Sequence, residues 1–350
     1  MKMQKSNWKV FVTKAFRSVL VTIISFFLLL TGGWYYVKTE FETQIKHAVF
    51  NLNQAGHKAK YDSLSIGGYP FNIKGNLKKV SFQQAPQRNN SVIDLSAATV
   101  EFNCSLFTPL TPKFIVNSQK AILSDNSGKE ISLSAPKMDG IVHLTTGGKI
   151  KEGEIRAVYP SLTAQDGSIT SAREFKFEVR HVRDEANKKQ RNLSLVGSLK
   201  NVQLSVASPF NENKILMIYL DSILSNTETL PLTKQDLASW RDSQGIMQVR
   251  TLSLKSPNIS AHAAGNIQLD AQLRPEGKLS IKTPVLNELI SVFSFYGTLS
   301  SDAEKTLKFM QGFNMAIPQS KDSNLSLSLK AKNGKLSMGG IPISTLKPLA

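Results

Sequence analysis

The feature that most constrains the fold is an alternation of apolar and polar side chains along much of the chain. The longest run extends from Ile259 to Leu273, where every second residue is apolar or glycine. Successive side chains of a β-strand point to opposite faces, so this run predicts one strand with an apolar and a polar face. Shorter runs of the same kind are Ile93–Ala97, Ile131–Leu133, Phe175–Val179, Leu193–Leu199 and Leu325–Leu329. The chain is therefore predicted to be mainly β with a few helices (α+β), built on a long, twisted antiparallel sheet or β-meander.

Turn signals separate these runs. Asn333-Gly334 lies between two of them and is the strongest short hairpin signal. Gly67-Gly68 followed by Pro70 predicts a sharp structural turn, because glycine accepts positive φ and proline extends the residue before it. The phase of the alternation changes at Lys200-Asn201, which predicts a bulge or turn there.

Helical spacing occurs in four places. Apolar residues between Phe41 and Leu52 follow a helical period, and Gly56 is a fitting stop, so an amphipathic helix is expected over 38–56. Packing on the exported domain is its favoured role, and lying on the membrane surface is the alternative. Further helical pieces are expected at Ile215–Ile223, around Leu237–Trp240, and from Pro284 onward.

The cellular location of the protein is predicted from a 20-residue stretch without a charge, Ser18 to Val37. It is long enough to cross a membrane as a helix, and the preceding residues carry five basic side chains and no acidic one. A cleaved signal peptide is the rival interpretation, but its apolar core is usually only about 7–15 residues. The predicted order is a cytoplasmic basic segment (1–17), a transmembrane helix (18–37), a juxtamembrane helix (38–56) and an exported β-rich domain (57–350), which could divide near 210–240.

This topology predicts a single-pass protein of a bacterial inner membrane, with its N-terminus in the cytoplasm and its C-terminal domain in the periplasm. The net charge is +17, and without the five basic residues before the predicted anchor it is +12 on the exported part (38 Lys+Arg against 26 Asp+Glu), which favours anionic partners by long-range attraction. Export across the membrane argues against nucleic acid as a partner, so anionic lipid head groups or polysaccharide phosphates are the expected partners. A merely basic, soluble surface is the plainer explanation of the same charge.

No catalytic constellation is evident in the sequence. The five histidines are far apart and have no metal-ligand spacing, so no metal and no cofactor are predicted. The single cysteine, Cys104, lies in an apolar run and is interpreted as a small buried side chain. We therefore predict that the protein is not an enzyme, and an enzyme acting on envelope polymers is the third of three hypotheses.

Several segments together resemble a known group of proteins. They are the cationic start, the single anchor, the Tyr61–Phe71 turn block, the Leu252–Leu273 strand pair, the Arg274–Gly277 turn and the Gly339–Pro342 ending. In these the chain resembles an uncharacterised bacterial family, classed as a domain of unknown function, of membrane-anchored exported proteins. Its architecture is more loosely similar to AsmA-like envelope proteins, a resemblance that implies long curved sheets and lipid traffic between membranes.

A long sheet with one apolar face must cover that face with helices, a second sheet or a ligand. The leading hypothesis is a periplasmic binding protein for a lipid or another amphipath, possessing a groove and serving envelope lipid transport or maintenance. The alternative is a non-enzymatic envelope scaffold that binds a protein partner and has a filled core. The predicted groove residues, which would pack an ordinary core under the alternative, are Ile259, Ala261, Ala263, Gly265, Ile267, Leu269 and Leu273.

Overall fold

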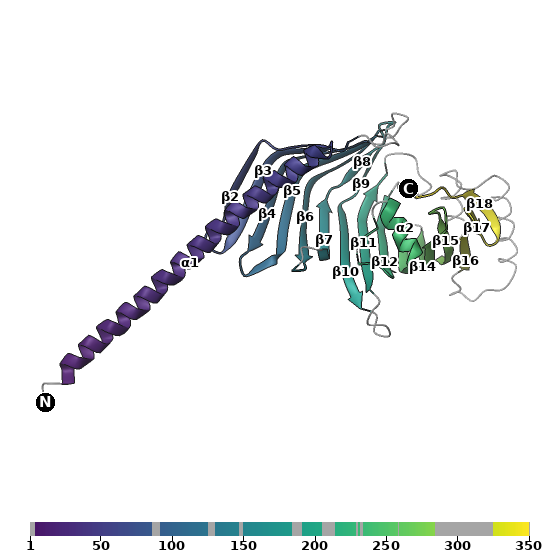
Figure 1. The fold of residues 1–350 in the computed structure, drawn as a ribbon. Helices are drawn as coiled ribbons and strands as arrows, with labels where there is room; N and C mark the ends of the chain where they lie inside the picture. The colour runs from purple at the N-terminus through teal and green to yellow at the C-terminus, as the bar shows by residue number, and fades with distance from the viewer. Residues whose placement is uncertain are drawn as a thin grey trace.

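A computed structural model of the 350-residue chain describes residues 4–85, 92–124, 130–146, 150–183, 191–204, 214–228, 230–231, 234–257, 259–283 and 325–349. Within these ranges the chain forms 18 strands of a single sheet and two helices, α1 (Gln4–Gln54) and α2 (Lys234–Asp242) (Figure 1). The predicted mainly-β fold with a long antiparallel sheet is confirmed.

The strands follow one another as a meander. They are β1 (Lys58–Lys60), β2 (Ser63–Gly67), β3 (Asn72–Gln83), β4 (Val92–Ser105), β5 (Thr108–Ser124), β6 (Glu130–Leu144), β7 (Ile150–Val158), β8 (Ser161–Thr163), β9 (Ile169–Ser171), β10 (Glu174–Arg183), β11 (Arg191–Gln203), β12 (Lys214–Leu224), β13 (Met247–Lys255), β14 (Ser260–Leu269), β15 (Pro275–Thr283), β16 (Leu325–Lys332), β17 (Lys335–Met338) and β18 (Ile341–Thr345). Antiparallel pairs join β2 through β7 in order, then β7 to β10, and β10 through β18 in order. The short strands β8 and β9 pair with each other and extend the sheet between β6 and β11.

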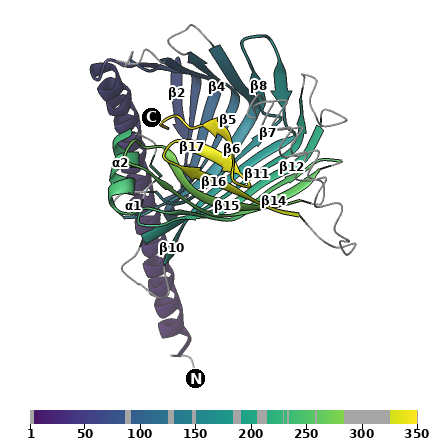
Figure 2. The same cartoon turned by 90° about the vertical axis from the view of Figure 1, so that its right-hand side faces the viewer.

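The strands of the N-terminal part bend along one line across the sheet. Lys79, Ser118, Tyr159 and Asn201 have φ between 49° and 50°, the left-handed region that side chains seldom adopt. The residue pairs on either side place Lys79 of β3 and Ser118 of β5 opposite the same residue of β4, Ala98. The left-handed residues thus lie on alternate strands along a common line. We call this line the crease. Figure 2 shows that the sheet is curved rather than flat.

The crease keeps apolar side chains on one face of the bent sheet. A left-handed residue shifts the alternation by one, so Leu199 and Val202 pack in the same cluster although they are three residues apart. The irregularity predicted at Lys200-Asn201 is thereby confirmed. Two small side chains, Ala157 and Ala172, are buried beside the crease.

Other expectations have mixed outcomes. The hairpin at Asn333-Gly334 is confirmed between β16 and β17, and the helical turn around Trp240 is confirmed as α2. The helix expected at Ile215–Ile223 is wrong, because this segment is strand β12 and pairs along its length with β11 and β13. Its apolar residues satisfy both a helical and a strand spacing, and pairing with two neighbouring strands decides between them. The helix expected from Pro284 onward lies outside the described residues.

The longest alternating run is not one strand. β14 ends at Leu269, and the chain then turns at Asp270, whose Oδ1 accepts hydrogen bonds from the backbone N–H of Gln272 (2.8 Å) and Arg274 (2.9 Å). Leu273 adopts a φ of 59° in this turn. The predicted fifteen-residue strand is therefore wrong in length, because a side chain that caps its own backbone competes with the ladder.

Replacement of Asp270 tests how strongly this turn is held. Burial acts against the charged carboxylate, but backbone and side-chain hydrogen bonds from Arg274 outweigh it and lower the pKa of Asp270 below its ordinary value of 3.8. A lowered pKa stabilises the folded chain above pH 3.8, and this contribution is lost as the pH falls through the lowered value. We expect Asp270→Asn to cost about 1–2 kcal/mol at pH 7. In urea unfolding, this difference should shrink below pH 3.8, and a pH-independent difference would contradict the ion pair.

Candidate functional site

One face of the sheet is apolar from β3 to β16, and we call it the inner face. One row of residues crosses the middle of this face, and the strand pairings place each of them opposite the next on the neighbouring strand. The row is Gly75, Phe102, Phe114, Gly140, Ile155, Phe177, Gly197, Leu220, Leu252, Ala263, Ile281 and Leu327. Both helices lie on this side of the sheet, since α1 packs on Phe102 and α2 packs on Leu195 (Figure 2).

Phenylalanine rings lie flat over glycines of the neighbouring strands in this row. A Cβ added to Gly75 would fall 1.8 Å from the Phe102 ring, and one added to Gly140 would fall 2.3 Å from the Phe114 ring. The sheet can hold a ring in this position only because the opposite residue has no side chain. The inner face thus has a low, smooth aromatic floor.

Beyond the crease, the inner face carries a cluster of exposed aliphatic side chains. Their relative exposures lie between 40% and 45%, and the strand pairings make them neighbours on β4, β5, β6 and β8. The members of this aliphatic patch are Leu95, Leu123, Ile131, Leu133 and Leu162. Contiguous exposed apolar surface of this kind is uncommon on soluble monomers and marks a contact surface.

The C-terminal half of α1 covers one end of the inner face. The Phe41 ring stacks on the Phe102 ring with centroids 4.7 Å apart, and the Trp34 indole N–H donates a 2.8 Å hydrogen bond to the carbonyl of Asn72. The predicted juxtamembrane helix is thus the C-terminal part of one continuous helix that packs on the sheet. The same side of α1, from Tyr36 to Ala48, borders an open groove of about 450 Å³.

The predicted groove residues of β14 lie on the inner face but mostly within packed clusters. Ile259 packs with residues of β11 and β12, while Ala263 packs with Ile281. Leu269 and Leu273 pack around the α2 residue Trp240. The structure therefore buries five of the seven predicted residues, whereas Gly265 and Ile267 line an open concavity beside β15 and β16. Their assignment to a groove stays a prediction.

Of the predicted turn residues, Gly67 ends β2, and Gly68 and Pro70 lie between β2 and β3, close to α1. Gly68 has a φ of 99°, and its carbonyl accepts a 3.0 Å hydrogen bond from the backbone N–H of Asn72. The neighbouring Tyr69 side chain meets α1, with its hydroxyl 2.7 Å from that of Thr31. The turn thus presents a surface on which the helix rests.

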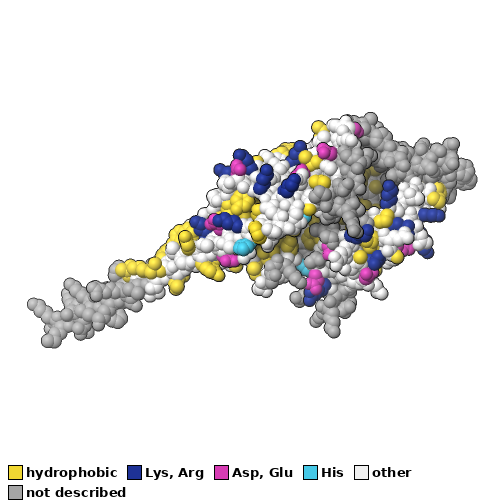
Figure 3. Space-filling view, turned by 45° about the horizontal axis from the view of Figure 1, so that its top comes forward, with side chains coloured by type: hydrophobic (Ala, Val, Ile, Leu, Met, Phe, Trp, Pro, Cys, Tyr) yellow, Lys and Arg dark blue, Asp and Glu magenta, His cyan; other side chains and the backbone are white. Residues whose placement is uncertain are grey.

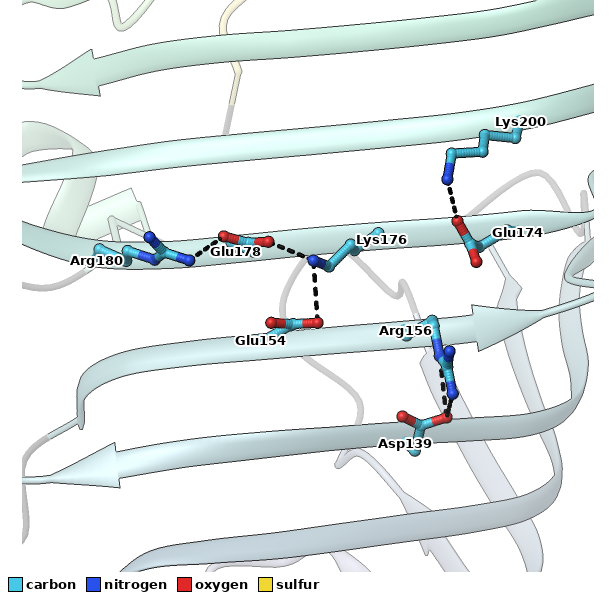
Figure 4. A network of polar contacts seen from close by, with 8 residues as sticks. All are labelled: Asp139, Glu154, Arg156, Glu174, Lys176, Glu178, Arg180 and Lys200. Atoms are coloured by element: carbon cyan, nitrogen blue, oxygen red, sulfur yellow. Dashed lines mark hydrogen bonds and ion pairs between the residues drawn. The ribbon is translucent and has the colours of Figure 1, made fainter.

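The opposite, outer face carries charged side chains that neutralise one another across the strands between β6 and β11 (Figure 4). Lys176 lies between Glu154 and Glu178, and its hydrogen bond lowers the pKa of Glu178. The other pairs in this network are Arg156 with Asp139, Arg180 with Glu178, and Lys200 with Glu174. Such ladders solvate a sheet face and hold it in register, and none of these groups is left to act on a substrate.

No catalytic or metal-binding arrangement appears among the residues that the structure describes. In those ranges no three histidine, cysteine, aspartate or glutamate side chains could share a metal ion. Cys104 is partly buried and its Sγ lies 3.2 Å from the carbonyl of Pro109, and burial raises the pKa of its thiol. A raised pKa disfavours the nucleophilic thiolate.

The sequence predicts a membrane span within α1. Over the described residues, no helix reaches the combination of length and hydropathy that a membrane-crossing segment requires.

Comparison with known proteins gives one match. No curated protein and no solved structure matches the chain. The looser likeness to AsmA-like proteins thus gains no support and stays a prediction. A family model described as "uncharacterized protein conserved in bacteria (DUF2125)" matches residues 34–347. That range includes the part of α1 that packs on the sheet and all 18 strands. By this match, the chain belongs to the DUF2125 family of proteins conserved in bacteria.

Proposed function

We propose that the protein binds the acyl chains of an envelope lipid, or of a similar amphipath, on the inner face of its sheet. The aliphatic patch carries this proposal, because five large aliphatic side chains on adjacent strands remain 40–45% exposed. Covering this surface with hydrocarbon would stabilise the complex by about 25 cal/mol for each Å² removed from water.

The shape and chemistry of the inner face suit a chain of methylene groups. Phe41 of α1 already covers the Phe102 ring, but the Phe114 ring lies flat over Gly140, so an acyl chain could pass over this part of the floor beside α1. The face offers few hydrogen-bonding groups along its central row, and an acyl chain requires none. The open groove beside α1 would continue this surface toward the membrane-proximal end of the sheet.

We further propose that α1 anchors the protein in a bacterial inner membrane, with the sheet in the periplasm. The support is the uncharged stretch Ser18–Val37 after a basic segment, together with the course of α1 away from the sheet (Figure 1). Leu28 and Leu29 are among its most exposed apolar side chains. The structure does not describe the side chains of Val19, Val21 and Ile23, three further apolar residues of the same stretch.

A scaffold that binds a protein partner is the second candidate. The clusters around Trp240 and Ile259 favour it, because Ile259, Leu269 and Leu273 are buried in packed side chains as in an ordinary core. The two candidates differ in what would cover the aliphatic patch.

Lipid recovery separates the two candidates. Full-length protein is extracted from bacterial membranes in a non-ionic detergent and examined by native mass spectrometry. We expect a discrete lipid mass on the wild type and its loss in the double variant Leu95→Glu/Leu133→Glu, because charges in the patch oppose an acyl chain. Both leucines are already exposed, so folding should be retained.

The matched control is the double variant Ser96→Glu/Ser132→Glu. It adds the same charges one residue away, on the outer face of the same strands. Retained lipid in the control together with lost lipid in the leucine variant supports the proposal. A clean protein mass for the folded wild type, or equal lipid recovery in both variants, would overturn it.

A further inference from the structure

Four lysines gather on the outer face of the C-terminal strands, although they are scattered in the sequence. Lys278 of β15 is directly opposite Lys330 of β16, and Lys332 of β16 is directly opposite Lys335 of β17. All four are exposed. We call them the lysine patch. Like charges directly opposite one another destabilise an antiparallel pair, so two such pairs side by side are unfavourable in the absence of a ligand.

The lysine patch differs from the charged network of the outer face. Between β6 and β11, the bases Arg156, Lys176, Arg180 and Lys200 each have a carboxylate partner (Figure 4). By contrast, none of the four lysines forms an ion pair with any residue that the structure describes. Figure 3 shows dark blue side chains over this end of the molecule. Lys120 and Lys137 of the outer face also have no ion pair with a described residue, so the lysine patch is distinguished by lysines that lie directly opposite one another.

A concavity of about 620 Å³ lies at the same place. Its polar lining residues are Lys278, Lys330, Lys332, Asn266, Gln268 and Glu276, and the remainder of the lining is Ile246, Ile267, Ala331, Gly265 and Gly277. Three ammonium groups against one carboxylate leave a net positive lining, and the two amides add neutral hydrogen-bond donors. Lysine binds phosphate as a point charge, and amide donors complete such a site.

We propose that this concavity and the lysine patch bind the phosphate of an anionic lipid head group. The open form of the site favours a lipid over a free phosphate ion, because its lysines are exposed and spread over three strands. Such a spread matches the repeated phosphates of a lipid surface, whereas a single small anion is held by enclosed donors. The lysines belong to the outer face, so the charge of the site does not depend on the acyl-chain proposal for the inner face.

Two short-chain lipids with identical acyl chains test the head-group site. Full-length protein in non-ionic detergent is titrated by calorimetry with dihexanoyl phosphatidylglycerol and with dihexanoyl phosphatidylcholine. We expect the anionic lipid to bind about tenfold more tightly, equivalent to about 1.4 kcal/mol. The preference should weaken as salt is raised above about 0.15 M, where screening acts within about 8 Å. Because the acyl chains are the same, binding of both lipids reports the inner face and the ratio reports the lysine patch.

Charge-removing variants test whether the lysine patch causes the preference for the anionic lipid. Lys278→Gln/Lys330→Gln should abolish it, while Lys120→Gln/Lys137→Gln should keep it, since the latter removes two exposed outer-face lysines from the N-terminal part of the sheet. Lys330→Glu should also abolish it and should raise the unfolding temperature by placing a carboxylate opposite Lys278. An unchanged preference in Lys278→Gln/Lys330→Gln, an equal loss in the control, or inorganic phosphate binding as tightly as the anionic lipid would overturn the proposal.

Discussion

Replacing Trp240 with alanine is expected to destabilise the protein by about 3–5 kcal/mol, the usual range for a buried tryptophan. The side chain is 7% exposed and packs in a cluster with Leu193, Leu224 and Leu269. Its indole N–H also donates a 2.8 Å hydrogen bond to the carbonyl of Ser225. The substitution therefore removes the contact that joins α2 to the inner face and leaves a cavity behind it.

Urea unfolding of the full chain, followed by circular dichroism of the strands, measures this loss without relying on tryptophan emission. Trp240→Phe should fall between wild type and alanine, because it keeps most of the packing but leaves the Ser225 carbonyl without its donor. Phe107→Ala is the control, since that ring is 72% exposed and should change the unfolding free energy little. A loss below about 1 kcal/mol for Trp240→Ala would show that α2 does not hold this end of the sheet.

Replacing Gly75 with alanine is expected to cost about 1–3 kcal/mol through overpacking. The new Cβ would lie 1.8 Å from the Phe102 ring. The ring cannot simply move away from the sheet, because Phe41 of α1 stacks on its other side at 4.7 Å. The substitution should therefore loosen the docking of α1 as well as the β3–β4 pair.

A double-mutant cycle with Phe102→Leu isolates the contact. If the ring lies on Gly75, the double variant should be more stable than the sum of the two single losses predicts, by about 1 kcal/mol. Gly153→Ala is the matched control on β7, because its Cβ would meet no atom closer than 3.7 Å. Additive losses, or an equal cost for Gly153→Ala, would contradict the aromatic floor.

The sheet and its two faces could be predicted from alternation alone, because a period of two specifies a strand wherever one face is buried. The hairpin at Asn333-Gly334 and the phase change at Asn201 were also readable from local residues. Strand β12 could not be predicted from local residues, because its apolar residues fit a helix as well as a strand. Its pairing with β11 and β13 determines that it is a strand. The end of β14 was missed because Asp270 caps a turn inside an otherwise regular pattern.

The candidate sites depend on pairing, which no single segment reveals. Gly75 and Phe102 are neighbours only because β3 and β4 pair in one register, and the same holds for Lys278 and Lys330. A partial signal for the lysine patch was present, since Lys330, Lys332 and Lys335 flank the hairpin turn with strand spacing. Lys278, on a strand that precedes them by about fifty residues, could not be added without the structure.

Photo-crosslinking in living bacteria from two adjacent positions of β6 is the most direct test of whether the inner face binds lipid. A benzophenone amino acid is introduced at Leu133, which lies in the aliphatic patch, or at Ser132, which faces the opposite side. Cells carry radioactive phosphate in their lipids, and the purified protein is examined for covalently attached label after irradiation. Acyl-chain binding on the inner face predicts labelled lipid on the protein crosslinked at position 133 and little at position 132. Equal labelling at both positions, or a protein adduct in place of lipid at position 133, would contradict it.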